Sequence, residues 1–388
     1  MRRGPRMTAG PGREALRQAP AAPRWSVVAP QGAAGELAGA GGAEGWQLLL
    51  ETARTVRRHG LGALWLLDRT DTTPRRAPEP VWEGWTALAG LAAAVPGLEL
   101  GLLSPAAPFR NAALLAKRAA SADHICGGRL SLGLTAAAYG PEHHSTGAAP
   151  AAGEPPSGEG GAPEGGFPEG GSPEGGFFGD EGGHRAVGET AEALRALWGG
   201  RPVTFAGEHV RLAAAHCVPA PHQQPLPLAL RLDAGEEGAG ARRPADAAVR
   251  ECTAVQWTGE THDIARAIEE FGWRRTALGA DPGGVRHAWA AECRVFDSVL
   301  ERDRWLCSPH EVHFWSHHPD LLARRSLYGT PDQIADRARS LLAAGVSEFV
   351  LWFRDYPRTT SLERLLTDIA PRIDTTAGPG AGTGGAEE

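Results

Sequence analysis

The chain has 388 residues, of which 42% are hydrophobic, and its formal net charge is −7 at pH 7. This acidic balance gives no reason to expect nucleic acid or an acidic membrane surface as a partner, and no apolar run approaches the roughly 18–20 residues of a membrane span. Five scattered cysteines without a CxxC pair favour reduced thiols in a cytoplasmic protein over a disulfide framework.

The N-terminal part begins with an extension and then alternates apolar runs with helical spacing. Residues 1–24 are rich in Arg, Ala, Gly and Pro and lack the apolar core of a signal peptide, so we expect them to be disordered. Helical spacing of apolar residues follows, with Gly60 as a terminator. The predicted order is strand 25–29, helix 44–59, strand 61–67 and helix 82–94.

The segment from Leu98 to Tyr139 is the most informative part of the chain. A hydrophobic run (LELGLLS) ends, Arg110-Asn111 opens a helical pattern, Gly127-Gly128 ends it, and RLSLGL starts a second strand. Two parallel strands joined by a crossover helix form one β-α-β unit. Because ligands of parallel α/β folds sit beyond the carboxyl ends of the strands, the residues just after each strand are the candidates for chemistry.

The regular pattern stops over residues 147–184. This tract is rich in Gly, Pro and Glu and contains the repeat PEGGF, PEGGS, PEGGF at 163–177. Such a composition buries too little apolar surface to offset the entropy of ordering, so we expect a disordered insertion. It interrupts the fold at a strand-to-helix loop, where either a tolerated expansion or a functional lid is compatible with the architecture.

The remainder again alternates strands and helices. A helix that begins at Pro331 is well signalled, with Thr330 as its N-cap and Gly345 beyond its end. About eight strands alternating with helices, and no GxGxxG, favour a (β/α)8 TIM barrel over 25–372 with a disordered tail over 373–388. The predicted elements are helix 187–198, a hairpin over 203–212, strands 226–232 and 254–258, helix 261–278, strand 285–296, helix 331–344, strand 349–353 and helix 362–369.

The order of motifs resembles the luciferase-like monooxygenase superfamily, and within it the coenzyme F420-dependent oxidoreductases. The most specific part is FRNAALLAKRAASADHICGGRLSLGL, at 109–134. It is accompanied by LGALWLLDRT (61–70), WEGWTALAGLAAAVPGLELG (82–101), YGPEHHSTG (139–147), ALRALWGGRPVTFAGEHVRL (193–212), AVQWTG (254–259) and YGTPDQIADRARSLLAAGVSEFVLWF (328–353).

This resemblance implies a luciferase-like barrel that holds a flavin or deazaflavin at the carboxyl ends of its strands, in a homodimer that acts on a small-molecule substrate. The implied activity is hydride transfer between coenzyme F420 and that substrate. Two alternatives stay open. One is an FMN-dependent two-component monooxygenase served by a flavin or F420 reductase. The other is a barrel that has lost catalysis and serves as a binding or scaffold subunit.

Three departures from the family pattern bear on activity. Relatives commonly read WLxDHF after the second strand, but this chain has Arg69 in place of the His, and an Arg is always protonated and cannot act as a general base. Thr135 and Ala136 replace flexible positions of GxGAGWY. Gly235 is kept in the turn DAGEEGAG, whose acids would weaken a phosphate site.

Carried onto this sequence, the resemblance implies catalytic and cofactor-binding residues but no metal site. Each has a structural alternative: Asn111 can simply cap a helix, Asp68 and Arg69 can form a plain ion pair, and His143 can be a solvated loop residue. His313, His317 and His318 lack an accompanying Glu or Cys pattern, so no metal ligation is expected. The catalytic candidates are Asp68, Arg69 and His143, and the cofactor-binding candidates are Ala107, Arg110, Asn111, Thr135, Ala136, Tyr139, Gly235 and Trp257.

Overall fold

Eight parallel strands close into a barrel, in the order β1, β2, β3, β4, β7, β8, β9, β11. Closure is complete because β9 pairs with both β8 and β11, and β11 pairs in turn with β1. The computed structural model describes residues 22–70, 79–105, 110–136, 181–235, 245–308 and 319–374. The barrel strands are β1 (Arg24–Val28), β2 (Leu64–Leu67), β3 (Leu100–Pro105), β4 (Leu130–Thr135), β7 (Leu228–Asp233), β8 (Ala254–Thr258), β9 (Arg286–Val295) and β11 (Glu348–Phe353).

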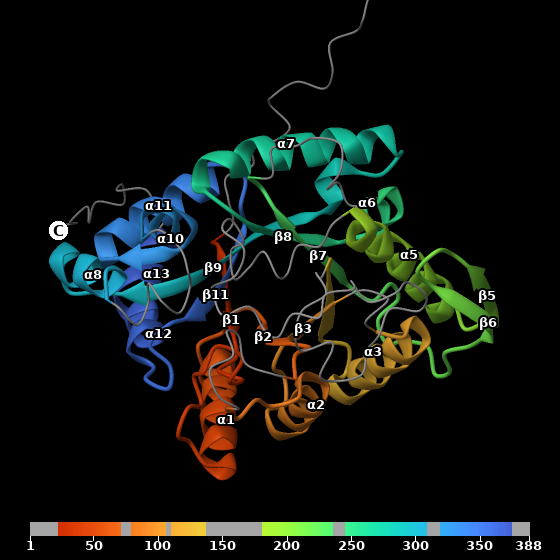
Figure 1. Ribbon diagram of the computed structural model, residues 1–388, viewed down its shortest axis with the longest axis horizontal. Helices are drawn as coiled ribbons and strands as arrows, with labels where there is room; N and C mark the ends of the chain where they lie inside the picture. Colours follow the sequence, from red (N-terminus) through yellow and green to blue (C-terminus); the bar gives the residue numbers. More distant parts are fainter. Residues whose placement is uncertain are drawn as a thin grey trace, which may run out of the picture.

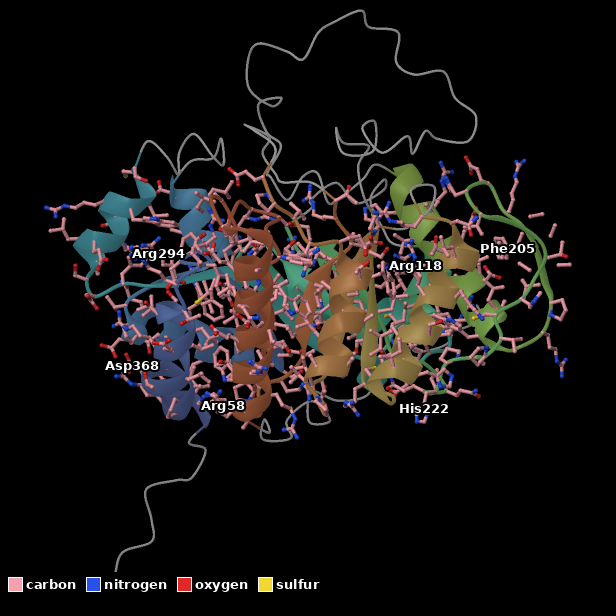
Figure 2. All side chains as sticks on the ribbon, turned by 90° about the horizontal axis from the view of Figure 1, so that it is seen from below. Arg58, Arg118, Phe205, His222, Arg294 and Asp368 are labelled. Atoms are coloured by element: carbon pink, nitrogen blue, oxygen red, sulfur yellow. The ribbon has the colours of Figure 1, made fainter. Side chains whose placement is uncertain are left out.

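Helices surround this barrel on its outside (Figure 1). In the side view, α1, α2 and α3 stand next to one another as part of this ring (Figure 2). They are α1 (Gly42–Arg58), α2 (Gly84–Ala94), α3 (Ala112–Cys126), α5 (Glu181–Trp198), α6 (Asp246–Glu251), α7 (Thr261–Ala277), α8 (Val299–Leu306), α10 (Pro319–Arg325), α11 (Pro331–Ala343), α12 (Thr360–Arg364) and α13 (Ala370–Asp374), the last two joined by a π-helical turn, Leu365–Ile369.

Two small additions complete the fold. The predicted hairpin is present as antiparallel β5 (Val203–Ala206) and β6 (Arg211–Ala215), which projects beside α5 (Figures 1 and 2). A short strand, β10 (Leu327–Gly329), pairs with the last residues of β9 beyond the point where β9 meets β8. The predicted (β/α)8 barrel is therefore confirmed, with one extra strand at its carboxyl end.

Local sequence signals place the helix ends. Asn111 caps α3 by accepting the Leu114 N–H at 3.0 Å, and α3 ends at Gly127, whose φ of +66° is the left-handed conformation that favours glycine. Thr330 and Gln333 form a reciprocal capping box at the start of α11. These caps fix where each helix starts relative to the strand before it.

Residues of each strand alternate between two apolar layers. In β2, Leu64 and Leu66 pack outward with the helices, whereas Trp65 and Leu67 belong to a separate cluster inside the barrel. The inner cluster also contains several alanines of β7 and β9, whose small side chains leave room for the large indole.

The indole of Trp65 lies across the inner faces of β3 and β4. Two glycines make this possible, because a methyl group at Gly101 would overlap the indole, and one at Gly133 would lie 2.9 Å from Leu103 and 3.2 Å from the indole. The Trp65 indole thus fills the barrel interior at the height of Gly101 and Gly133, where the two glycines leave room for it. Ligand space must lie toward the carboxyl ends of the strands.

Some expected boundaries were wrong. Helix α5 begins at Glu181 instead of 187, so residues 181–184, which were assigned to the insertion, form its first turn. Helices α6 and α8 were not predicted. They have only 6 and 8 residues, too few for apolar residues to recur at helical spacing. Within the described part of the chain, no helix combines the length and the apolar character needed to cross a membrane.

Candidate active site at the carboxyl ends of the strands

A buried ion pair follows β2 and β3. Asp68, directly after β2, is 4% exposed, and the Arg110 side chain reaches its Oδ2 with Nε at 2.9 Å. Arg110 also donates from Nη2 to Oδ1 and to the carbonyl oxygen of Asp68, each at 3.2 Å. The guanidinium is therefore held by a forked interaction with one residue, which fixes both its position and its plane.

Two neutral donors complete the environment of this carboxylate. The Ser104 hydroxyl, at the end of β3, donates to Oδ2 at 2.7 Å, and the indole N–H of Trp85 in α2 donates to the same oxygen at 3.3 Å. These two donors and the paired cation hold the Asp68 side chain in one orientation. The partner of Asp68 is thus Arg110, from the next strand-to-helix loop, and Asp68 acts to position that cation.

The end of β4 brings small side chains to the same rim. Thr135 and Ala136 are each 2% exposed, and Thr135 is in register with Arg231 of β7. Arg231 donates from Nη2 to Oε1 of Gln256 in β8 at 2.8 Å. The inner face of the barrel here is polar, in contrast to the apolar level around Trp65.

In the turn after β7, the charged and polar groups are bonded to one another and to neighbouring side chains. Asp233 forms an ion pair with Arg325 at the end of α10, and it accepts the Thr258 hydroxyl at 3.0 Å. The backbone N–H of Gly235 also donates to Asp233, at 2.9 Å. The negative charge expected at this turn is therefore compensated at Asp233, but the Gly235 amide is engaged with a side chain of its own turn.

Trp257 lies on the other side of the barrel wall. It packs with the outward layer against Phe271 of α7, and its indole N–H donates to Nδ1 of His287 at 3.1 Å. Strand alternation explains this placement, because Gln256 and Thr258 take the inner positions on β8. The side chain faces the helices and does not wall the barrel mouth, so we leave Trp257 out of the site.

A buried acid at this end was missed by sequence reasoning. Glu36, in the loop after β1, is 8% exposed and accepts the backbone N–H of Ala34 at 2.7 Å and the indole N–H of Trp352 at 3.3 Å. Burial raises the pKa of Glu36 above its usual value, although nearby Arg354 acts in the opposite direction. Only its position after a barrel strand was a signal, because the loop sequence GELAGAG is otherwise ordinary.

The remaining sequence candidates divide into two groups. Arg69 and Asn111 lie where expected, after β2 and at the start of α3, and Asn111 serves as the helix cap. Ala107, Tyr139 and His143 fall outside the described residues, as do His313, His317 and His318. The structure thus brings Asp68, Arg110, Thr135 and Ala136 to one end of the barrel and adds Glu36 and Trp352 to them.

The sequence model of the luciferase-like monooxygenase family matches residues 25–315. The chain belongs to the luciferase-like monooxygenase family. Its members are oxidoreductases and monooxygenases, so at this general level the protein is an enzyme of that kind. No curated protein matches it significantly in sequence.

Solved structures of this luciferase-like fold include enzymes with different cofactors. An F420-dependent secondary alcohol dehydrogenase in complex with an F420-acetone adduct has a TM-score of 0.64 at 17% identity, covering 90% of this chain and 98% of that one. The coenzyme F420-dependent tetrahydromethanopterin reductase from Methanopyrus kandleri gives 0.62 at 14%, covering 91% and 99%. The EDTA monooxygenase from Chelativorans sp. BNC1 gives 0.66 at 15%, covering 92% and 94%. At these identities the similarity concerns the fold.

Proposed function

We propose that this luciferase-like protein transfers hydride between coenzyme F420 and a small organic substrate. The observation that carries the proposal is the held cation, Arg110, at the carboxyl end of a closed barrel whose structural relatives include F420- and FMN-binding enzymes. The fold that the protein shares with the F420-dependent secondary alcohol dehydrogenase supports a cofactor of this kind. The motif order around 109–134 supports it independently.

The inner face of the barrel offers a donor that suits such a ring. The amide nitrogen of Gln256, on the polar inner face where its carbonyl oxygen accepts from Arg231, is buried and has no hydrogen-bond partner among the described residues. Leaving a buried donor unsatisfied costs about 1–3 kcal/mol, so a bound group with acceptor atoms would be stabilised there. A deazaflavin ring carries carbonyl oxygens and a ring nitrogen, and the residues present fit it.

In this proposal each side chain has a physical task. Arg110 provides positive charge for an anionic cofactor, Asp68 positions Arg110, and Thr135, a small residue on the inner face of β4, allows close approach of a planar ring. Ala136 packs in the outer layer and has no part in this. When bound, the cofactor supplies the hydride chemistry. Glu36 is the described acid at this end whose pKa is raised by burial, so we assign to its carboxyl the proton that accompanies the hydride.

Binding of the cofactor tests the proposal directly. The purified protein is titrated with coenzyme F420, and separately with FMN, and quenching of cofactor fluorescence is followed. We expect saturable binding of F420, weakened about tenfold (~1.4 kcal/mol) in Arg110→Gln. The matched control is Arg118→Gln, an exposed arginine in the same α3 region, which should bind F420 like the wild type. F420 that fails to bind at tens of micromolar, with FMN binding instead, would contradict the choice of cofactor.

An FMN-dependent two-component monooxygenase is the second candidate. The similarity to the EDTA monooxygenase, with a TM-score of 0.66, favours it. Such an enzyme consumes oxygen when a reductase supplies reduced FMN, whereas the F420 enzyme does not. A chain that binds neither cofactor would instead support a barrel without catalysis. Assembly as a homodimer remains a prediction from the family resemblance.

A further inference from the structure

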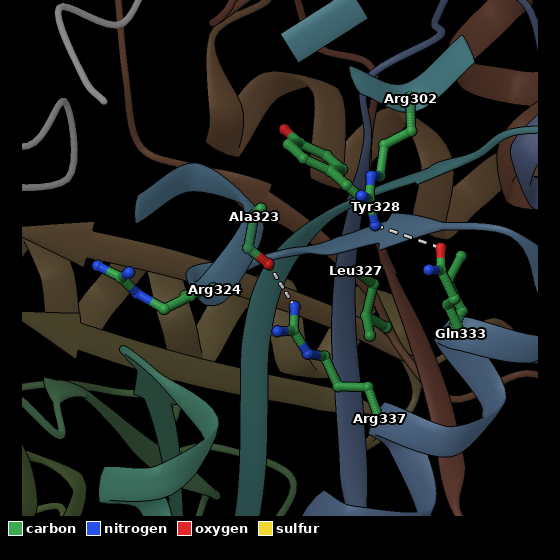
Figure 3. A pocket seen from close by; sticks show the side chains of 8 residues that line it. Arg302, Ala323, Arg324, Leu327, Tyr328, Gln333 and Arg337 are labelled. Atoms are coloured by element: carbon green, nitrogen blue, oxygen red, sulfur yellow. Dashed lines mark hydrogen bonds between the residues drawn. The ribbon is translucent and has the colours of Figure 1, made fainter. Parts of the chain in front are cut away.

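A cavity lies away from the barrel interior, among α8, α10, β10 and α11 (Figure 3). Its volume is about 230 Å³, and three of its eight lining residues are arginines: Arg302, Arg324 and Arg337. No Asp or Glu is among those eight. The lining is therefore strongly cationic, with a small apolar part formed by Leu327 and Ile334.

Two of these cations are held in place from different helices. Arg337 of α11 donates to the carbonyl oxygens of Ala323 and Ser326, at the C-terminal end of α10, and Arg302 of α8 donates to Oε1 of Gln333 at 3.3 Å (Figure 3). Burial lowers the pKa of Arg337, and the charge of Arg302 lowers it further. A bound anion would reduce the repulsion between Arg302 and Arg337, so this pair of like charges favours anion binding.

The carboxylates that accompany these arginines lie outside the lining. Asp303 contacts Arg302 at 2.7 Å with a side chain that is 53% exposed, and Glu260 contacts Arg324 at 2.8 Å. Asp303 accepts from Nε and Nη2 of Arg302, and Nη1 donates to Gln333, so only the second N–H of each terminal nitrogen is left for a ligand. Three arginines thus stand against two carboxylates. The inner side of the cavity consequently keeps its positive potential.

The first turn of α11 adds to this potential. Gln333 and Ile334 line the cavity, and they are the third and fourth residues of the helix after the Thr330 cap. The N-terminus of a helix carries a partial positive charge and attracts anions within its first turn. The partial charge of the helix end adds to the full charges of Arg302, Arg324 and Arg337.

We propose that this cavity binds a small oxyanion, the phosphate or carboxylate group of a larger ligand. At about 230 Å³ it is smaller than the roughly 300–1,000 Å³ of a pocket for a whole drug-sized molecule. Tyr328 connects it to the barrel, because this residue lines the cavity while its hydroxyl donates to Glu292 of β9. An anionic group that reaches the cavity from the carboxyl ends of the strands would have to pass Tyr328.

Inorganic phosphate is the probe for the site itself. At constant ionic strength, calorimetric titration should show saturable phosphate binding to the wild type and at least fivefold weaker binding to Arg302→Gln and to Arg324→Gln. Arg304→Gln is the matched control, because Arg304 is exposed on the same helix α8 and does not line the cavity. Phosphate that binds Arg302→Gln as well as the wild type, or that shows no saturable binding to the wild type, would overturn the proposal.

Two further titrations identify which ligand carries the anion. Only this step rests on the proposed function. If the cavity holds the phosphate of the cofactor, Arg302→Gln should weaken coenzyme F420 severalfold but leave its phosphate-free deazaflavin fragment unchanged. If it holds an anionic group of the substrate, both cofactor affinities stay as in the wild type while phosphate affinity falls. Phosphate binding without any F420 binding would reject the cofactor and keep the anion site.

Discussion

Asp68 and Arg110 form an ion pair at the carboxyl end of the barrel, where water has little access. The Asp68 side chain is 3% exposed and that of Arg110 is 20% exposed. A buried pair contributes modestly as a whole, but removal of one partner leaves the other charge buried without compensation. The stability of this site therefore depends on both members of the pair being present.

The Asp68–Arg110 pair should be far more sensitive to substitution than an exposed pair. We expect Asp68→Asn to lower the free energy of unfolding by about 3 kcal/mol, because Arg110 loses its charge partner. Asp246→Asn, which removes the partner of Arg274 at 2.6 Å on the surface, should cost less than about 1 kcal/mol. Urea unfolding of the three proteins gives the comparison. Equal losses for both variants would show that the rim pair is not specially dependent on burial.

His287 should make the fold sensitive to acid. Burial lowers the pKa of His287 to about 4, with a smaller effect from Arg275. Since the unfolded chain has a His pKa near 6.5, it binds more protons, and stability is lost as the pH falls from about 6.5 toward 4. The loss approaches about 3 kcal/mol.

The test of this pH dependence is the difference between the wild type and His287→Gln. A glutamine carbonyl can still accept the indole N–H of Trp257. We expect urea unfolding between pH 4 and pH 7.5 to show a smaller fall in stability for the variant. Parallel curves for the two proteins over this range would contradict a depressed pKa at this position.

Strands and helices in this fold are matched through side-chain size. The indole of Trp65 on β2 occupies the space left by glycines on β3 and β4, so three neighbouring strands depend on one another for their packing. In the outer layer, β8 packs through Trp257 on Phe271 of α7. Each strand therefore has one face that fits the interior and another that fits a helix.

An added methyl group at Gly101 should disturb this packing. Because it would overlap the indole of Trp65, we expect Gly101→Ala to lower the free energy of unfolding by about 2 kcal/mol. Gly42→Ala is the control, since a methyl group at the start of α1 meets no atom within 4 Å and should be neutral or slightly stabilising. Thermal unfolding distinguishes them. An unchanged melting temperature for Gly101→Ala would show that the indole has room to move.

For the molecule as a whole, all five cysteines are free thiols, and four of them are buried. Closure of the barrel gives the chain an interior that reagents reach only after unfolding. Burial also raises the pKa of these thiols, to about 12 at Cys252, so that they are protonated and unreactive near neutral pH.

Thiol titration should report this organisation. In the folded protein we expect one thiol per chain, exposed Cys307, to react rapidly with a disulfide reagent at pH 8. In denaturant without reductant all five should react. The Cys307→Ser variant should lose the fast-reacting thiol and keep four slow ones. Fewer than five thiols in the denatured chain would reveal a disulfide and contradict the reduced state.

Most strands and helices could be predicted because they depend on short stretches of sequence. Periodicity of apolar residues indicated the strands and helices, and the caps at Asn111 and Thr330 marked two helix starts. The rim position of Asp68 and Arg110 followed from their place after successive strands. Their mutual pairing did not, because the sequence placed Arg69 beside Asp68 and gave no measure of which arginine would reach the carboxylate.

Other parts of the site depend on contacts between distant segments. Glu36 and Trp352 lie 316 residues apart and meet only because the first and last barrel strands are neighbours. The same holds for the three arginines of the cavity beside β10, which come from three helices. The outward direction of Trp257 also required the register of β8, since shifting a strand by one residue exchanges its two faces.

By itself the sequence determined the kind of protein: a luciferase-like (β/α)8 barrel with its chemistry after the strands, because strand and helix periods and turn residues act over short distances. Only the tertiary structure decided which charges pair, which acid is buried at the rim and where cations converge. These are properties of side chains brought together by barrel closure, and their energies depend on burial and on distances that no local pattern encodes.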